Sequence, residues 1–132
     1  MPVGLSNELP PIHPVAGVYL GATAAKIKKN GKTDLVIIEL IEGTKTAATF
    51  TTNAACAAPV TLAKTHLKIK SPRAFLINSG NANAATGEAG LVNARQTCQW
   101  LADELGCTLE EVLPFSTGVI GEPLPIQKIQ QG

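Results

Sequence analysis

The chain passes from strand to helix through Arg73-Ala74-Phe75-Leu76-Ile77-Asn78-Ser79-Gly80-Asn81-Ala82-Asn83-Ala84-Ala85-Thr86-Gly87. The apolar run that ends at Asn78 predicts a strand. The residues after it are rich in Asn, Gly and Ala, which predicts a loop. A strand that leads through such a loop into a helix is typical of a layered domain of sheet and helices.

The helix predicted after this loop runs from about Glu88 to Leu105. Its apolar residues recur at steps of three and four along one face: Leu91, Ala94, Cys98, Leu101 and Leu105. Cys98 is therefore expected to be a small core residue and not a nucleophile. Gly106 follows at the position where glycine commonly ends a helix.

Toward the N-terminus, the pattern predicts strands first and then a helix. A strand interrupted near glycine is expected over residues 17–28, followed by an Asn-Gly hairpin turn at residues 29–32. The return strand, 34–40, is almost continuously apolar, which favours burial on both faces. A third strand is expected at 45–52 and a helix at 59–68, with Pro59 in its first turn. Residues 1–16 are proline-rich and are expected to form an extended lead-in.

Toward the C-terminus, Thr108 to Glu111 has the capping-box pattern of a short helix. Extended residues 112–115 are then expected to deliver a turn at Ser116-Thr117-Gly118. A last helix is predicted from about Pro125, and it reaches Gly132 after barely two turns. These elements predict one α/β domain over 17–132, in detail an α+β layered sandwich with a mixed sheet packed by helices, incomplete at its C-terminal end.

The composition argues against several classes of function. Charged residues make up 16% of the chain and the formal net charge is +1, which favours neither nucleic acid nor a membrane as partner. The three cysteines show no CxxC spacing, and His13 and His66 are far apart, so neither a metal site nor a disulfide framework is expected. Reduced thiols and the lack of an export signal favour the cytoplasm.

The best candidate for chemistry is Ser116-Thr117-Gly118. Glycine allows another group to approach its backbone closely, and a neighbouring hydroxyl supplies a second donor. Together they are the parts of an oxyanion hole, in which fixed donors stabilise a negatively charged oxygen as it develops. The alternative is an ordinary loop punctuated by glycine and proline.

Three weaker candidates remain open from the residues alone. The Asn side chains between Asn78 and Asn83 suit either a ligand carboxylate or the backbone of their own loop. Glu122 is the acid nearest the Ser-Thr-Gly segment and could act as a base. A self-cleaving threonine could serve as nucleophile, but no cleavage point stands out at Thr23, Thr86 or Thr117.

Several motifs together resemble the N-terminal part of the ornithine acetyltransferase family, whose members are bifunctional proteins of arginine biosynthesis. The segments that carry the resemblance occur in this order along the chain: Pro14–Gly17, Asp34–Val36, Phe50–Asn53, Cys56–Val60, Ile77–Ala84 and Phe115–Ile120. A series of spaced motifs in one order is far more specific than any single one.

The resemblance implies transfer of an acetyl group from N-acetylornithine to glutamate, with acetyl-CoA as a further acetyl donor in some members. We expect no resident cofactor and no metal. The precursor cleaves itself before a threonine, which becomes the nucleophile, and the α and β chains assemble as α2β2. The Thr117 hydroxyl and the Gly118 backbone N–H would form the oxyanion hole. The nucleophile and the cleavage site would lie beyond Gly132, so we expect no activity from these residues alone.

Two other functions compete with this expectation. The chain could be a catalytically inert structural or assembly half that pairs with other chains. It could also belong to the related autocleaving aminopeptidases of similar fold, which would hydrolyse peptides and not transfer acetyl groups. The Asn-Ser-Gly-Asn-Ala-Asn series from Asn78 to Asn83 makes the aminopeptidase less favoured.

Overall fold

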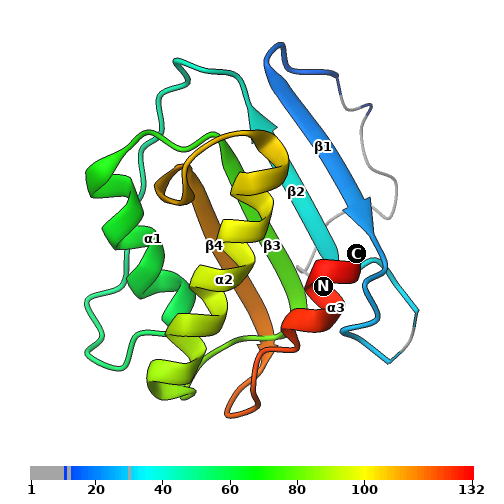
Figure 1. The fold of residues 1–132 in the computed structure, drawn as a ribbon, viewed down its shortest axis with the longest axis vertical. Coiled ribbons are helices and arrows are strands. Elements are labelled where there is room, and N and C mark those ends of the chain that lie inside the picture. Colours follow the sequence, from blue (N-terminus) through cyan, green and yellow to red (C-terminus); the bar gives the residue numbers. More distant parts are fainter. Residues whose placement is uncertain (1–10, 12, 30) are drawn as a thin grey trace.

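The computed structural model describes residue 11 and residues 13–29 and 31–132, and its ribbon is drawn in Figure 1. The elements in chain order are β1 (Val18–Thr23), β2 (Leu35–Leu40), α1 (Ala58–Ile69), β3 (Ala74–Asn81), α2 (Gly87–Leu105), the 3-10 turn η1 (Leu109–Glu111), β4 (Val112–Val119) and α3 (Ile126–Gln131). The strands form one sheet in the order β1-β2-β3-β4. The first two pairings are antiparallel and β3 pairs with β4 in parallel. The mixed sheet packed by helices confirms the predicted fold class.

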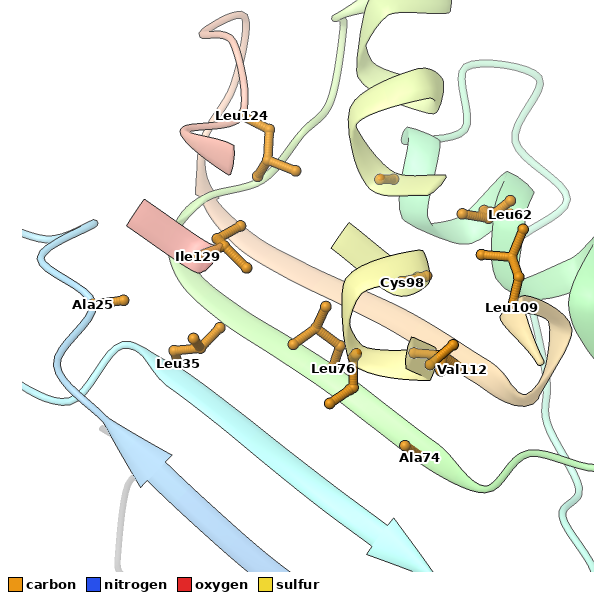
Figure 2. Close-up of a cluster of buried hydrophobic side chains, with 13 residues drawn as sticks. Ala25, Leu35, Leu62, Ala74, Leu76, Cys98, Leu109, Val112, Leu124 and Ile129 are labelled. Carbon is orange, nitrogen blue, oxygen red and sulfur yellow. The ribbon is translucent and has the colours of Figure 1, made fainter. Parts of the chain in front are cut away.

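The helices lie on one face of the sheet, and in Figure 1 α2 is in front of β3 and β4 with α1 to its left. The core between them is built mainly from small and aliphatic residues. Ala94, Cys98 and Ala102 of α2 are almost fully buried, which lets this helix approach β3 and β4 closely. Figure 2 shows Leu35, Leu76 and Val112 among the side chains that the strands contribute to this cluster.

Among the described residues, no helix lies on the opposite face of the sheet (Figure 1). Successive strand residues point to opposite faces, so Phe75 and Ile77 lie on the side away from buried Ala74 and Leu76. The strand register places Ile38 beside Phe75 on this face and Leu20 beside Ile38. Leu20 is 71% exposed. We call this surface the open sheet face.

Two predicted strands are wrong in part or in full. The first strand ends at Thr23, because the buried carboxylate of Asp34 accepts hydrogen bonds from the Ala25 and Lys28 backbone N–H groups and folds 24–28 into a loop. Residues 45–52 form no strand, since no neighbouring strand within the described residues pairs with them. The hairpin pairing of β1 with β2 is confirmed. The Asn30 position of its turn, and residues 1–10 and 12 of the lead-in, lie outside the described residues.

The helix predictions agree well with the structure. Both long helices begin and end within one residue of the predicted bounds, and Gly106 adopts the left-handed conformation with φ 63°. The Thr108–Glu111 capping box is present, but it begins a 3-10 turn of three residues and not an α-helix. The short last helix is also confirmed.

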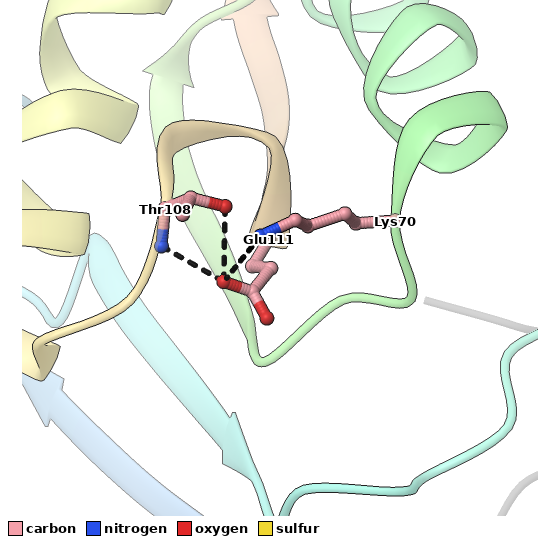
Figure 3. A network of polar contacts seen from close by, with 3 residues as sticks. All are labelled: Lys70, Thr108 and Glu111. Atoms are coloured by element: carbon pink, nitrogen blue, oxygen red, sulfur yellow. Dashed lines mark hydrogen bonds and ion pairs between the residues drawn. The ribbon is translucent and has the colours of Figure 1, made fainter.

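The capping box holds the ionised form of Glu111 (Figure 3). Its carboxylate accepts hydrogen bonds from the Thr108 backbone N–H at 2.8 Å and from the Thr108 hydroxyl at 2.9 Å. The pKa of Glu111 is lowered chiefly by the first of these bonds. Lys70 lies 3.7 Å from the same carboxylate, but its side chain is 45% exposed, so this ion pair adds little.

We predict that Glu111→Gln makes the protein less stable near neutral pH and that this difference shrinks in acid. Because the pKa of Glu111 is lower in the folded chain than its ordinary value of 4.5, its stabilisation is complete above that value and is lost as pH falls through the lowered one. Thermal unfolding at pH 7 and pH 3 measures this. Thr108→Val keeps the backbone donor and should show a smaller version of the same pH dependence. An equal loss of stability at both pH values would show that the ionised Glu111 carboxylate is not the source of the stabilisation.

Candidate active site

The parallel pairing of β3 with β4 brings the two polar motifs of the sequence side by side. Asn78 lies opposite Ser116, and Gly80 lies opposite Gly118. Both motifs sit toward the C-terminal ends of their strands, where binding sites in sheets of this kind commonly form. The motifs are 38 residues apart in the sequence, and no local pattern indicated that they would be neighbours.

The predicted turn at Ser116-Thr117-Gly118 is wrong. These residues belong to β4, which continues to Val119 before the chain bends at Ile120 to Glu122. Pairing with β3 holds these residues in an extended strand. Gly118 is therefore not needed to form a turn, and the reason for glycine at this position lies elsewhere.

Gly118 permits the close approach of the two strands. Its φ is +136°, and a Cβ placed there would lie 2.3 Å from the carbonyl carbon of Gly80 and 2.5 Å from the Asn81 nitrogen. Backbone atoms cannot yield as a flexible side chain can. The strand register is also irregular here, since Asn81 is paired with both Thr117 and Val119.

The two adjacent hydroxyls have different surroundings. Ser116 is half-buried, and its Oγ donates a hydrogen bond to Asn78 Oδ1 at 2.6 Å. Thr117 is exposed, and within the part of the chain that the structure describes its hydroxyl takes part in no hydrogen bond. Thr117 is thus the hydroxyl that remains available to a ligand, directly before Gly118.

The asparagines of the β3 motif hold the surrounding backbone. Asn81 Nδ2 donates to the carbonyls of Glu122 and Pro123, at 3.1 Å each. Asn83 Nδ2 donates to the Gly90 carbonyl of α2 at 2.9 Å. The backbone role, one of the two open possibilities for these side chains, is therefore the one observed.

The structure gives no support to Glu122 or to the two histidines as functional residues. The Glu122 side chain is exposed, and it is its backbone carbonyl that binds Asn81. His66 is buried, and its Nδ1 lies 2.7 Å from the Val112 carbonyl, so it anchors α1 to β4. Its Nε2 meets no partner among the described residues. His13 is exposed near the N-terminal end of the described residues.

The cysteines are free thiols, and Cys98 is fully buried in the core as predicted. Burial raises the pKa of the Cys98 thiol to about 12, which makes it a poor nucleophile. Burial is also the main cause of the raised pKa of Cys107. The described residues contain no cluster of three or more His, Cys, Asp or Glu able to hold a metal ion. None of their helices has the length and apolar character needed to cross a membrane.

A hollow of about 340 Å³ borders the candidate site. It lies between residues 48–51, the start of α1 and the Leu113–Ser116 part of β4. Lys64 holds the 48–51 wall in place, because its Nζ donates to the Thr51 carbonyl at 2.9 Å and lies 5.6 Å from the centre of the Phe50 ring. The hollow is mainly apolar, and it ends one residue before Thr117.

The structure thus combines a mixed sheet, helices on one face, and an exposed hydroxyl beside a glycine near the end of a parallel strand. The model of the ArgJ family matches residues 19–132, so the chain belongs to the ArgJ family. The chain is 53% identical over 130 residues to the arginine biosynthesis bifunctional protein ArgJ of Pseudomonas syringae pv. tomato. It is 54% identical over 117 residues to the protein of the same name from Methylococcus capsulatus.

These matches cover 98% and 89% of this chain but only 32% and 28% of the two relatives, so the chain spans about a third of their length. Two solved structures agree in fold. ArgJ from Bacillus halodurans has a TM-score of 0.84 at 31% identity, with 89% of this chain and 61% of that chain covered. Ornithine acetyltransferase from Mycobacterium tuberculosis, complexed with ornithine, has a TM-score of 0.84 at 36% identity, with 89% and 64% covered.

We predict that Gly118→Ala destabilises the protein by about 2 kcal/mol or more, because the added methyl group meets backbone atoms of β3 that cannot move aside. Gly21→Ala in β1 is the matched control, since nothing lies within 4 Å of its added Cβ. Urea unfolding measures both. If the two substitutions lower the free energy of unfolding by the same amount, the close approach of the strands does not explain glycine at position 118.

Proposed function

We propose that this chain is the N-terminal part of an arginine-biosynthesis acetyltransferase that moves an acetyl group from N-acetylornithine to glutamate. In this proposal the chain supplies the oxyanion hole, formed by the Thr117 hydroxyl and the Gly118 backbone N–H. The observation that carries it is the unused Thr117 hydroxyl beside a glycine that is fixed against the neighbouring strand. Membership of the ArgJ family supports the choice of substrates.

The proposed reaction proceeds through an acyl-enzyme. A threonine beyond residue 132 attacks the acetyl carbonyl of N-acetylornithine and forms a tetrahedral intermediate, whose oxygen carries the negative charge. Thr117 and Gly118 donate hydrogen bonds to that oxygen. Ornithine then leaves as the amine after taking up a proton, and the amino group of glutamate attacks the acetyl-threonine to give N-acetylglutamate. No resident cofactor is required, and acetyl-CoA would enter only as a second acetyl donor.

The remainder of the polypeptide is proposed to cover the open sheet face. Leu20, Phe75, Ile77 and Phe115 lie on this face, and Phe75 and Phe115 form an edge-to-face pair with ring centres 5.4 Å apart. The relatives are about three times as long as this chain, so their remaining two thirds could supply a second layer. We place self-cleavage into α and β chains, an α2β2 assembly and a cytoplasmic location in the same proposal.

The open sheet face also favours a second candidate, an inert assembly half whose contribution is structural. The autocleaving aminopeptidase is a third candidate, and peptide hydrolysis without acetyl transfer would identify it. The kinetic experiment below separates the first two, because an inert half has no reason to change the rate of the chemical step.

We predict that Thr117→Ala lowers kcat by about a hundredfold to a thousandfold with little change in KM, because an oxyanion donor acts mainly in the transition state. The protein to assay is a full-length chimera, in which this chain replaces the matching third of the Pseudomonas syringae relative. Acetyl transfer from N-acetylornithine to glutamate is measured. Thr65→Ala, an exposed threonine on α1, is the control and should match the unmutated chimera. An unchanged kcat for Thr117→Ala would exclude this role.

We predict that Leu20→Asp strongly destabilises the full-length chimera but is tolerated in the isolated chain. If the remaining polypeptide covers the open sheet face, the new carboxylate becomes a buried charge without a partner. Val92→Asp is the matched control, because Val92 is also exposed, at 56%, but lies on the outside of α2. Thermal unfolding measures both variants. Equal tolerance of the two aspartates in the chimera would show that the open sheet face stays uncovered.

A further inference from the structure

Asn78 connects β4 to the irregular part of β3. Its Oδ1 accepts the hydrogen bond from Ser116 at 2.6 Å, and its Nδ2 donates to the Asn81 carbonyl at 2.8 Å. The side chain is 5% exposed, so each end of this amide depends on its protein partner. Ser116 directly precedes Thr117, and Asn81 lies opposite both Thr117 and Val119. The Asn78 amide therefore binds the residue before the candidate donors Thr117 and Gly118, and also a residue that lies opposite them in the sheet.

The donor pair has little support of its own. Thr117 is exposed and its hydroxyl takes part in no hydrogen bond within the described residues, while Gly118 has no side chain. The direction of both donors thus depends on the course of the β4 backbone. That course is set by the parallel pairing with β3, to which the Ser116–Asn78 bond and the contact of Gly118 with the Gly80–Asn81 peptide add side-chain and packing support.

The residues that follow Gly118 are held by the same asparagine motif of β3. Asn81 binds the carbonyls of Glu122 and Pro123, and the Ala82 backbone N–H donates to the Val119 carbonyl at 2.8 Å. Because Asn78 in turn holds the carbonyl of Asn81, a connected series of hydrogen bonds links Ser116, before the pair, to Glu122 and Pro123, after it. A shift of about 1 Å in a catalytic group can cost about a hundredfold in rate, so this support bears directly on chemistry.

We propose that Asn78 and Ser116 are positioning residues, which hold the Thr117 and Gly118 donors in the direction that the reaction requires. The proposal rests on the oxyanion role proposed above. Neither residue touches substrate in this account. Their hydrogen bond sets the end of β4, and its loss lets the donors turn away from the developing oxygen while substrate binding is retained.

The test compares Ser116→Ala, Asn78→Ala and the double variant in the full-length chimera, with kcat given per acetylated active site so that unfolded protein is not counted. We expect each single variant to lower kcat between about tenfold and a hundredfold with KM little changed. The double variant should lose no more than the worse single one, because the two residues act as one unit. Ser116→Thr retains the hydroxyl and should restore most of kcat.

Gln99→Ala is the matched control, since it removes a side-chain hydrogen bond with Asp103 on the surface of α2 and should leave kcat unchanged. If the Ser116 and Asn78 variants keep full kcat per active site while Thr117→Ala loses it, the positioning role is overturned and the oxyanion role stands. If Thr117→Ala also keeps full kcat, both are overturned. Losses that add in the double variant, or a Ser116→Thr variant as impaired as Ser116→Ala, would likewise overturn the positioning role.

Discussion

The close approach of β3 and β4 at Gly80 and Gly118 is the constraint on which the rest of the site depends. A side chain at position 118 would meet the backbone of the neighbouring strand, so the parallel pairing can extend to Val119 only with glycine there. The same contact fixes the peptide that carries the proposed N–H donor. The contact between Gly118 and Gly80 therefore affects both the stability of the strand pair and the direction of the proposed donor.

Helix positions and fold class could be predicted from the sequence because their signals are local. The spacing of Ala94, Cys98 and Leu101, and Gly106 after them, is enough to define α2. The strand at 45–52 was wrong because a strand also needs a neighbour, which no local pattern reports. The loop at 24–28 was missed because it depends on a long-range contact with the Asp34 carboxylate.

The candidate residues could be chosen from the sequence, but their arrangement in space could not. Ser116, Thr117 and Gly118 look alike as turn formers in the sequence, yet pairing with β3 separates their roles. Ser116 is used inside the protein, Thr117 is left free, and Gly118 allows the strands to meet. The asparagines between 78 and 83 are the partners that bring about this division, and only the sheet register shows that Asn78 faces Ser116.

A crystal structure of the acetylated full-length chimera would test the central claim most directly. We expect the acetyl carbonyl oxygen to lie about 2.7–3.1 Å from both the Thr117 hydroxyl oxygen and the Gly118 backbone nitrogen. A carbonyl oxygen that points away from β4 and accepts its hydrogen bonds from other residues would contradict the oxyanion role of Thr117 and Gly118.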